Sequence, residues 1–339
     1  MKSEIFIEQL DLRITQIKDL VKRSNKMPLM VLTQHPIEEE DELRLPYVRE
    51  CFSNILCFVE VGDTAMLPVI FDKMQDVVDK VVLDIDNKRP NSQEIIRFVQ
   101  TYRQPLQVLT YSDLDMWSNA ALEFIEYIEK SMERKRVLLL GQSYLMPRLL
   151  MGLLKKGALV HVRACDFADG VLLLDRDNSI RLDSPNCLVL PDIDSEQQYD
   201  VIVGCELLSP IKNLPTTVFA EHTYDIGLYN FSQQFIATQK QHGGIVYRFD
   251  NRAGMSGVIL RLMETMDLVE HIMGEVTIGD ISVVSGGQLG ADGAIVVDNC
   301  YNPSMVLGVA NGCGMFKSDE ELTSEDKEHL QKIHKLINH

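Results

Sequence analysis

The sequence has no long apolar run, a single tryptophan among 339 residues, and far fewer basic than acidic side chains. No stretch approaches the roughly 20 apolar residues that span a bilayer, and residues 1–5 lack the apolar core of a signal peptide. The 50 acidic side chains outnumber 33 basic ones, and the formal net charge is −17. This excess argues against nucleic acid or an anionic membrane surface as the main partner. We therefore expect a cytoplasmic protein that contacts no membrane.

Paired metal ligands are also missing. The seven cysteines form no Cys-x-x-Cys pair, and the eight histidines form no His-x-x-x-His pair. An odd number of isolated cysteines, mostly in apolar surroundings, is typical of a reducing compartment and not of a disulfide framework. Structural and catalytic zinc sites use closely spaced Cys and His ligands that this chain does not offer. We expect no bound metal.

The most informative segment runs from residue 134 to residue 166. An apolar strand at 137–140 leads into Gly141-Gln-Ser143, an apolar helix follows, and a second strand leads to Asp166. This order predicts the first βαβ unit of a doubly wound nucleotide-binding domain. The backbone N–H groups of such a turn can hold a phosphate, and Ser143 can donate a further hydrogen bond. Alternatively, Gly141 serves only to turn the chain.

Asp166 follows the second strand, 25 residues after Gly141. In dinucleotide-binding folds this is where an acidic side chain holds a ribose 2′-hydroxyl. A carboxylate there repels a 2′-phosphate, so the sequence predicts NAD as cofactor, with NADP less favoured. The alternative is a surface aspartate that ends a strand.

The rest of the chain alternates strands and helices, which indicates an α/β fold with parallel strands. We predict an N-terminal α/β substrate domain over 1–112, a Rossmann-like doubly wound domain over 113–270, and a β-rich extension with a terminal helix over 271–339. The extension reads as antiparallel. Within these domains the pattern predicts, among other elements, a helix at 47–56, a strand at 81–84 and a small hairpin formed by 171–174 and 187–190.

Further candidate site residues follow later strands. Gly204 and Gly227 end two of them, with Asp225 beside Gly227. Ligands of open α/β sheets collect at the carboxyl ends of the strands, so these residues are expected to border the cofactor. Asp225 could equally be a turn residue. Arg248, Asp250 and Arg252 precede a glycine-containing helix, and they suit either an anionic ligand or a salt-linked loop.

Read in order, these segments resemble the bifunctional methylenetetrahydrofolate dehydrogenase/cyclohydrolase family. The resemblance covers about residues 5–270. It is carried by an opening helix followed by Pro-Leu-Met-Val-Leu (28–32), Tyr-Val-Arg (47–49), Val-Val-Leu-Asp (81–84), Leu-Gly-Gln-Ser (140–143), Lys-Gly-Ala-x-Val-x-Val (156–162), Asp-Val-Ile-Val-Gly (200–204) and Asp-Ile-Gly (225–227).

The resemblance implies roles for particular residues. Tyr47 matches a tyrosine of the family's second helix, while Cys51 stands where the family has its catalytic lysine. A thiol cannot replace a positioned ammonium, so we expect no cyclohydrolase activity. Cys51 is then either a nucleophile with a lowered pKa or a buried structural cysteine. Asp84 stands near the family's pterin-binding glutamine and could accept N–H donors from a folate or pterin, with Arg252 as a second substrate-binding residue.

Three functions therefore remain open. The first is an NAD(P)-dependent oxidoreductase that acts on a small molecule and transfers a hydride in a cleft between its domains. In this case the extension would cover the cleft or join a homo-oligomer. The second is a non-catalytic or regulatory relative that keeps the fold. The third is an S-adenosylmethionine-dependent methyltransferase, which would show a seven-stranded sheet with a reversed final hairpin.

Overall fold

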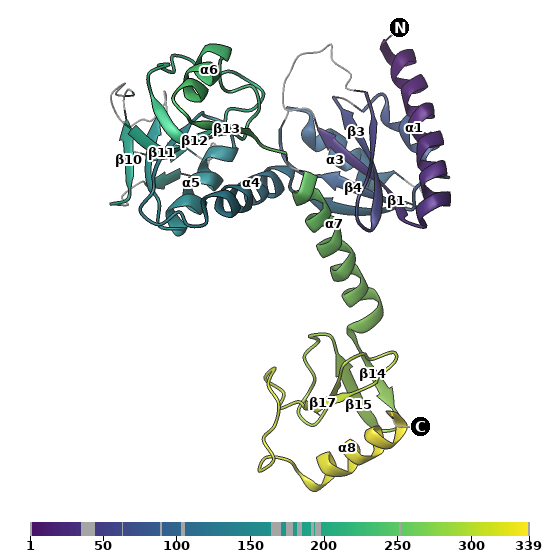
Figure 1. Ribbon diagram of the computed structural model, residues 1–339. Helices are drawn as coiled ribbons and strands as arrows, with labels where there is room; N and C mark the ends of the chain where they lie inside the picture. Colours follow the sequence, from purple (N-terminus) through teal and green to yellow (C-terminus); the bar gives the residue numbers. More distant parts are fainter. Residues whose placement is uncertain are drawn as a thin grey trace. The chain divides into compact units, whose positions relative to one another are not determined.

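In a computed structural model the chain forms two units, Met1–Val258 and Ile259–His339 (Figure 1). The structure describes all residues except 1, 35–44, 63, 89, 103–105, 164–170, 174–178, 182–184, 191–192, 194–197, 251 and 338–339. No helix in the described part of the chain is long and apolar enough to cross a membrane. The first unit holds two α/β sheets, and the domain boundaries at 112 and 270 stay predictions.

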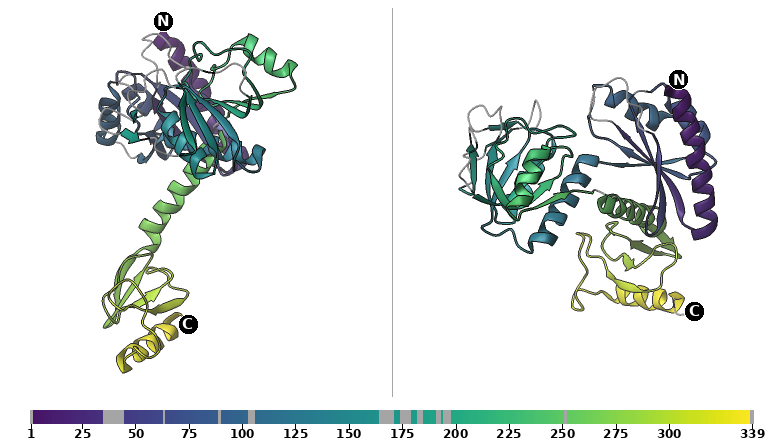
Figure 2. Two further views of the ribbon diagram at one scale, coloured as in Figure 1. Left: turned by 90° about the vertical axis from the view of Figure 1, so that its left-hand side faces the viewer. Right: turned by 45° about the horizontal axis from the view of Figure 1, so that its top comes forward.

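The first sheet has five strands in the order β2-β3-β1-β4-β5. Its parallel strands are β1 (Met27–Gln34), β3 (Asn54–Val61), β4 (Lys80–Asp84) and β5 (Gln107–Tyr111). Three helices accompany it: α1 (Lys2–Ser24), α2 (Leu67–Met74) and α3 (Ser92–Thr101). Figure 2 shows α1 lying along one face of this sheet. The central strands are apolar on both faces, as expected for strands covered by helices on each side.

The helix predicted at 47–56 is wrong. Residues Tyr47–Glu50 form strand β2, which pairs antiparallel with β3, and a turn at 51–53 joins the two strands. Tyr47 lies opposite Phe58 in the register, and the two rings stack with centroids 4.6 Å apart. Such cross-strand aromatic pairs stabilise a hairpin. Because the segment is a strand, Tyr47 and Cys51 do not lie on one helical face.

The second sheet has six strands in the order β10-β7-β6-β11-β12-β13, and all neighbours are parallel. When these six strands are numbered in the order in which they occur along the chain, their order across the sheet is 3-2-1-4-5-6. This is the strand order of the dinucleotide-binding Rossmann fold. The α/β fold class with a Rossmann-like domain is therefore confirmed. The strands are β6 (Arg136–Leu140), β7 (Leu159–Arg163), β10 (Cys187–Leu190), β11 (Gln198–Gly204), β12 (Phe219–Asp225) and β13 (Ile245–Arg248).

The hairpin predicted from 171–174 and 187–190 is wrong in its second strand. Val171–Leu173 (β8) pairs with Ser179–Arg181 (β9), whereas Cys187–Leu190 extends the main sheet beside β7. The sequence of a four-residue apolar strand does not indicate which other strand it will pair with. Helices α4 (Asp113–Glu129), α5 (Leu145–Lys155) and α6 (Gln233–Gln241) complete this region. The chain passes from the first unit to the second within α7 (Arg252–Asp267), which is followed by a π-helical turn at Leu268–Ile272.

A buried carboxylate ties α4 to the second sheet. The Glu129 side chain is fully buried, and its Oε1 accepts a hydrogen bond of 2.5 Å from the Tyr224 hydroxyl and lies 2.7 Å from Nδ1 of His222. Lys135 pairs with the other carboxylate oxygen. Burial alone would raise the pKa of Glu129, but the hydrogen bonds from Lys135, Tyr224 and His222 outweigh it, so the pKa lies below its usual value.

Replacing Glu129 with glutamine should therefore make folding less stable and less sensitive to acid. Because the folded-state pKa is depressed, the stabilisation is present above the unfolded-state pKa and is lost as the pH falls through the folded-state value. We expect Glu129→Gln to lower the free energy of unfolding by about 1.5–3 kcal/mol at neutral pH, the range for hydrogen bonds to a charged group. Urea unfolding between neutral pH and about pH 3 would show this difference shrinking with acid.

Glu126→Gln is the matched control on the same helix. Its carboxylate pairs with Lys156 and is half exposed, so the change should cost less than about 1 kcal/mol. Equal losses for the two variants, or a difference that does not depend on pH, would contradict the role of Glu129.

The second unit contains a four-stranded sheet in the order β14-β15-β16-β17 and a terminal helix, α8 (Ser324–Ile337). The strands are β14 (Gly274–Ile278), β15 (Ile281–Ser285), β16 (Ile295–Val297) and β17 (Val306–Val309). The sheet is mixed and not fully antiparallel, because β15 and β16 run parallel. Val283, Ile295 and Val309 pack with Ile333 of α8 in one apolar cluster, which makes this unit a small core of its own.

Candidate functional site

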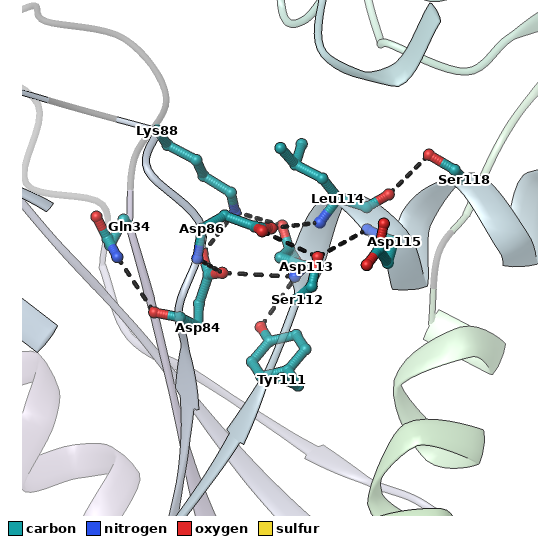
Figure 3. Close-up of polar contacts among 10 residues, drawn as sticks. All are labelled: Gln34, Asp84, Asp86, Lys88, Tyr111, Ser112, Asp113, Leu114, Asp115 and Ser118. Carbon is teal, nitrogen blue, oxygen red and sulfur yellow. Dashed lines mark hydrogen bonds and ion pairs between the residues drawn. The ribbon is translucent and has the colours of Figure 1, made fainter. Parts of the chain in front are cut away.

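A buried lysine lies between two aspartates where β4 and β5 end (Figure 3). Asp84 is the last residue of β4, and Asp113 is the first residue of α4, just after β5. Lys88 Nζ lies 2.7 Å from Asp84 Oδ2 and 2.6 Å from Asp113 Oδ2, and its side chain is only 5% exposed. Parallel neighbouring strands bring their carboxyl ends to one sheet edge, which explains why residues 25 apart meet here.

Backbone and side-chain hydrogen bonds hold this arrangement in place. Asp84 Oδ1 accepts from the N–H of Asp86 at 3.0 Å, and Asp86 Oδ2 accepts from the N–H of Leu114 at 2.7 Å. Ser112 caps α4 by accepting from the N–H of Asp115, and it also donates to Asp86. The loop after β4 is thereby fastened to the start of α4, so Lys88 has a defined position.

The electrostatics of the three charged groups are unequal. Burial raises the pKa of Asp84 to about 6, although Lys88 and the backbone offset part of the effect. Burial alone would lower the pKa of Lys88, but Asp113 and Asp84 together outweigh it and raise the pKa. Lys88 is therefore an ammonium across the neutral range, while Asp84 titrates close to neutrality. A group of this kind beside a pocket is a candidate for proton transfer.

Lys88 and Asp113 line a pocket of about 270 Å³ in the first unit. The wall combines residues of the first sheet with residues that follow β11 and β12 in the second. The charged and amide side chains in the wall are Gln34, Arg49, Glu60, Lys88 and Asp113, and its apolar part includes Phe58, Met116, Trp117 and Leu207. Apolar walls with a few converging polar groups are typical of small-molecule sites.

A second pocket of about 200 Å³ lies at the carboxyl ends of β6 and β11, where the strand order of the Rossmann sheet reverses. Gly141, Gln142, Arg163, Glu206 and Lys212 are among its lining residues. This reversal point is where doubly wound folds bind nucleotides. The pocket therefore has the position expected for a dinucleotide.

The turn in this second pocket requires glycine, and one of its backbone N–H groups donates to a carboxylate. Gly141 has φ +123°, and a Cβ there would come within 2.6 Å of the backbone nitrogen of Glu206. The N–H of Gln142 donates to Glu206 Oε2 at 2.7 Å, so a carboxylate already occupies the position of an anion. Ser143 Oγ donates to the carbonyl of Cys205 and accepts from the N–H of Leu145. The turn fits a phosphate, provided that the Glu206 side chain turns away.

The remaining predicted residues fall into separate groups. Gly204 and Gly227 pack tightly around the loop after β11. A Cβ added to Gly204 would come within 2.7 Å of Asn230 Oδ1, and a Cβ added to Gly227 would come within 1.9 Å of the carbonyl oxygen of Glu206. Asp225 accepts from the N–H of Asn230 at 3.3 Å, and Asn230 in turn donates to the carbonyls of Glu206 and Ser209. These residues therefore shape the loop that carries Glu206.

In the first sheet, Tyr47 lines the larger pocket and Asp84 lies fully buried behind Lys88. Cys51 lies at the β2–β3 turn, where its N–H bonds to the carbonyl of Asn54 and its carbonyl accepts from Lys26. Asp166 lies outside the described residues. Arg252 opens α7, and its side chain is likewise outside the described part.

Sequence reasoning missed Lys88, Asp113, Arg49 and Glu206. A signal for the first two was present, because Asp-x-Asp-x-Lys follows one strand and Ser-Asp begins the helix after the next. Arg49 was predicted to lie in a helix, and Glu206 is not part of any recognisable sequence motif. Among the residues that the structure describes, no three His, Cys, Asp or Glu side chains gather in a way that could hold a metal ion.

No protein-family model and no curated protein matches the chain. Solved structures to which it is similar include an L-tryptophan dehydrogenase from Nostoc punctiforme, with 13% identity and a TM-score of 0.39 over 69% of this chain and 73% of that one. Another is a shikimate dehydrogenase from Aquifex aeolicus, with 13% identity and a TM-score of 0.36 over 73% and 93%. A third is an Ael1 enzyme from Pseudomonas putida, with 14% identity and a TM-score of 0.39 over 71% and 92%. Identity and structural similarity are low throughout, so the Rossmann assignment rests on this chain's own strand order.

Proposed function

We propose that this chain is an oxidoreductase that uses a pyridine dinucleotide, NAD or NADP. The observation that carries the proposal is the 3-2-1-4-5-6 order of the second sheet, with the Gly141 turn and a pocket at its reversal point. When bound, the dinucleotide supplies or accepts a hydride. The division of labour that we propose assigns residues 1–112 to the substrate, 113–270 to the dinucleotide and 271–339 to an extension that joins a homo-oligomer.

Lys88 is the proposed proton-transfer residue. Its ammonium lines the larger pocket, so it can donate a hydrogen bond to a substrate carbonyl oxygen and stabilise the charge that forms there. As the carbonyl is reduced to an alcohol, that oxygen takes a proton from Lys88 Nζ. Asp84, which pairs with Lys88 from behind and has a pKa near 6, can return a proton to Lys88. Asp113 holds Nζ from the other side.

The choice between NAD and NADP depends on residues of opposite charge. Asp166 favours NAD by the argument from its place after β7. Arg163 and Lys212 line the second pocket, and two cations favour the additional phosphate of NADP. Arg163 Nη1 already donates to the carbonyls of Lys212 and Asn213, so we propose NAD and NADP as equal candidates, and the screen below compares them.

The structure bears differently on the other functions. The methyltransferase alternative needs a reversed final strand, but β13 runs parallel to β12 in the described sheet. A folate substrate loses support, because the segment compared with the family's catalytic helix is a strand. A non-catalytic relative would keep the fold without binding the cofactor.

A thermal-shift screen with NADH, NADPH, S-adenosylmethionine and tetrahydrofolate separates these functions. A ligand at about 100 times its Kd stabilises the folded state by about 2.7 kcal/mol, which is a clear rise in Tm. We expect NADPH or NADH to raise the Tm and the other two to leave it unchanged. No response to either dinucleotide would overturn the proposal, and a response to S-adenosylmethionine alone would favour the methyltransferase.

Glu206→Gln should tighten dinucleotide binding. The Glu206 carboxylate accepts the Gln142 N–H that a cofactor phosphate would use, so the change to a neutral amide weakens the competing acceptor and removes a repulsive charge. Effects of about 0.5–1 kcal/mol are usual for a charge at a helix N-terminus, which corresponds to a Kd about 2- to 5-fold lower. Isothermal titration with NADH and NADPH measures the change. A higher Kd in the variant would show that Glu206 helps to bind the cofactor.

A further inference from the structure

The larger pocket contains two buried polar atoms that nothing in the described chain satisfies. Arg49 Nη1 and Gln34 Oε1 are both buried and have no hydrogen-bond partner, and both residues line the pocket with Lys88. Leaving such atoms unsatisfied costs about 1–3 kcal/mol each, and more for a charged group. Unsatisfied groups that converge on a pocket are explained when a ligand supplies the missing partners.

Arg49 requires an anion. It lies on β2, and its Nη1 has no hydrogen-bond acceptor among the residues that the structure describes. Glu60 of β3 lines the same pocket, as does Asp113. Asp113, however, already pairs with Lys88. An arginine fork matches the two oxygens of a carboxylate, which makes a carboxylate the natural partner of this guanidinium.

Gln34 requires a hydrogen-bond donor. Its Nε2 donates to the backbone carbonyl of Asp84 at 3.1 Å, which orients Oε1 as the unsatisfied acceptor. Lys88 also pairs with Asp84, so Asp84 contacts both the Gln34 amide and the Lys88 ammonium (Figure 3), and Gln34 and Lys88 both line the pocket. A hydroxyl group satisfies both neighbours at once, because it accepts from Lys88 Nζ and donates to Gln34 Oε1.

The rest of the wall is apolar. Phe58, Met116 and Leu207 line it, together with Trp117, whose indole N–H is already satisfied by the carbonyl of Ile226 at 3.0 Å. The Trp117 ring therefore offers an apolar surface to a ligand. The volume of the pocket is about 270 Å³. This size suits a small ligand and is below the 300–1,000 Å³ of most drug-sized sites.

We propose that the substrate is a small monocarboxylate with an apolar body and a secondary alcohol or ketone. Arg49 binds its carboxylate, Gln34 and Lys88 bind the oxygen at the reacting carbon, and the apolar wall holds the body. The redox part of this inference rests on the proposed function. In the direction of oxidation, the carbon–hydrogen bond breaks with its electron pair passing to the oxidised dinucleotide. The hydroxyl turns from Gln34 to Lys88, and its proton passes to Lys88 Nζ as Nζ gives one of its own protons to the Asp84 carboxylate.

Binding of matched acid and amide pairs tests the inference without any turnover. The probes are 3-phenyllactate, mandelate and 2-hydroxy-4-methylpentanoate, each compared with its own primary amide by isothermal titration. We expect at least one acid to bind wild type at least about tenfold more tightly than its amide, a difference of about 1.4 kcal/mol. Arg49→Met should abolish the preference, and Arg49→Lys should keep part of it.

The Tm of the Arg49→Met variant shows whether Arg49 binds the carboxylate or supports the fold. Because the Arg49 guanidinium is partly buried without a counter-ion, Arg49→Met should leave the Tm unchanged or raise it by about 2–4 °C. A loss of Tm would mean that Arg49 supports the fold. Arg97→Met, at an exposed position of α3 that lines neither pocket, is the matched control and should keep the preference for the acid.

Failure of the inference and failure of the proposed function give different results. If no acid binds better than its amide, or if Arg49→Met keeps the preference, the substrate class is wrong whatever the cofactor does. If the acids bind through Arg49 but NADH and NADPH do not bind, the carboxylate site stands and the oxidoreductase proposal falls.

Discussion

Replacing Lys88 with methionine should lower the free energy of unfolding by about 3–5 kcal/mol, the usual loss when one partner of a buried ion pair is removed. The reason is that Asp84, which is fully buried, and Asp113, whose side chain is 11% exposed, would lose the one ammonium that both contact. Urea unfolding at neutral pH measures the loss. If a substrate is found, the same change should also remove turnover, because no other described cation contacts both aspartates.

Two further variants make this expectation specific. Lys80→Met, at the start of β4, removes a lysine whose Nζ donates to the neutral amide oxygen of Gln107 at 2.6 Å, and it should cost less than about 1.5 kcal/mol. Asp84→Asn in the Lys88→Met background removes one stranded charge and should restore part of the loss. Equal losses for the two lysines, or no recovery in the double variant, would show that Lys88 is not bound to the aspartates.

Gly141→Ala should destabilise the fold by about 3–4 kcal/mol, because two independent penalties act at this position. A φ of +123° is a conformation that alanine rarely adopts, and such strain costs about 1–3 kcal/mol. In addition, the new Cβ would lie 2.6 Å from the nitrogen of Glu206 and 3.0 Å from the carbonyl carbon of Cys205, both of them backbone atoms that cannot move aside freely. Chemical unfolding and dinucleotide binding would both report the change.

Gly243→Ala isolates the conformational penalty. Its φ is +85°, and no atom lies within 4 Å of the position that a Cβ would take. This variant should cost only about 1–2 kcal/mol. If Gly141→Ala were no more costly than Gly243→Ala, the close approach between the β6 turn and the β11 loop would be wrong.

Local patterns predicted much of the fold. The strand, glycine turn and helix at 136–155 could be predicted because each signal lies within a few residues: an apolar strand, a glycine at the turn and an apolar helix face. The same holds for β4 and the opening helix α1. These elements need no information about distant partners.

The errors arose where distant contacts decide the structure. Residues 47–56 have a spacing that suits a helix, but pairing with β3 makes them a hairpin. Residues 187–190 join β7, which is 24 or more residues away in sequence. Secondary structure in such short segments depends on which neighbour covers them, and a pattern within the segment does not contain that information.

The candidate site follows the same division. Gly141 and Ser143 were predicted because a turn motif is local. Lys88 and Asp113 were missed because they meet only through the pairing of β4 with β5, and Glu206 was missed because it reaches the Gly141 turn through the pairing of β6 with β11. Tyr47 and Cys51 were paired by an assumed helix, whereas Lys88 is the lysine that the structure places beside the pocket.

Hydrogen–deuterium exchange with and without saturating NADH or NADPH tests the proposed dinucleotide site most directly. The cofactor should slow exchange in peptides that cover residues 140–146 and 204–212, since these hold the N–H groups around the second pocket. Peptides from α1, which lines neither pocket, would serve as an internal reference. Protection confined to those two segments and their neighbours is the expected result. Unchanged exchange at residues 140–146 with either cofactor at saturation would contradict dinucleotide binding at the Gly141 turn.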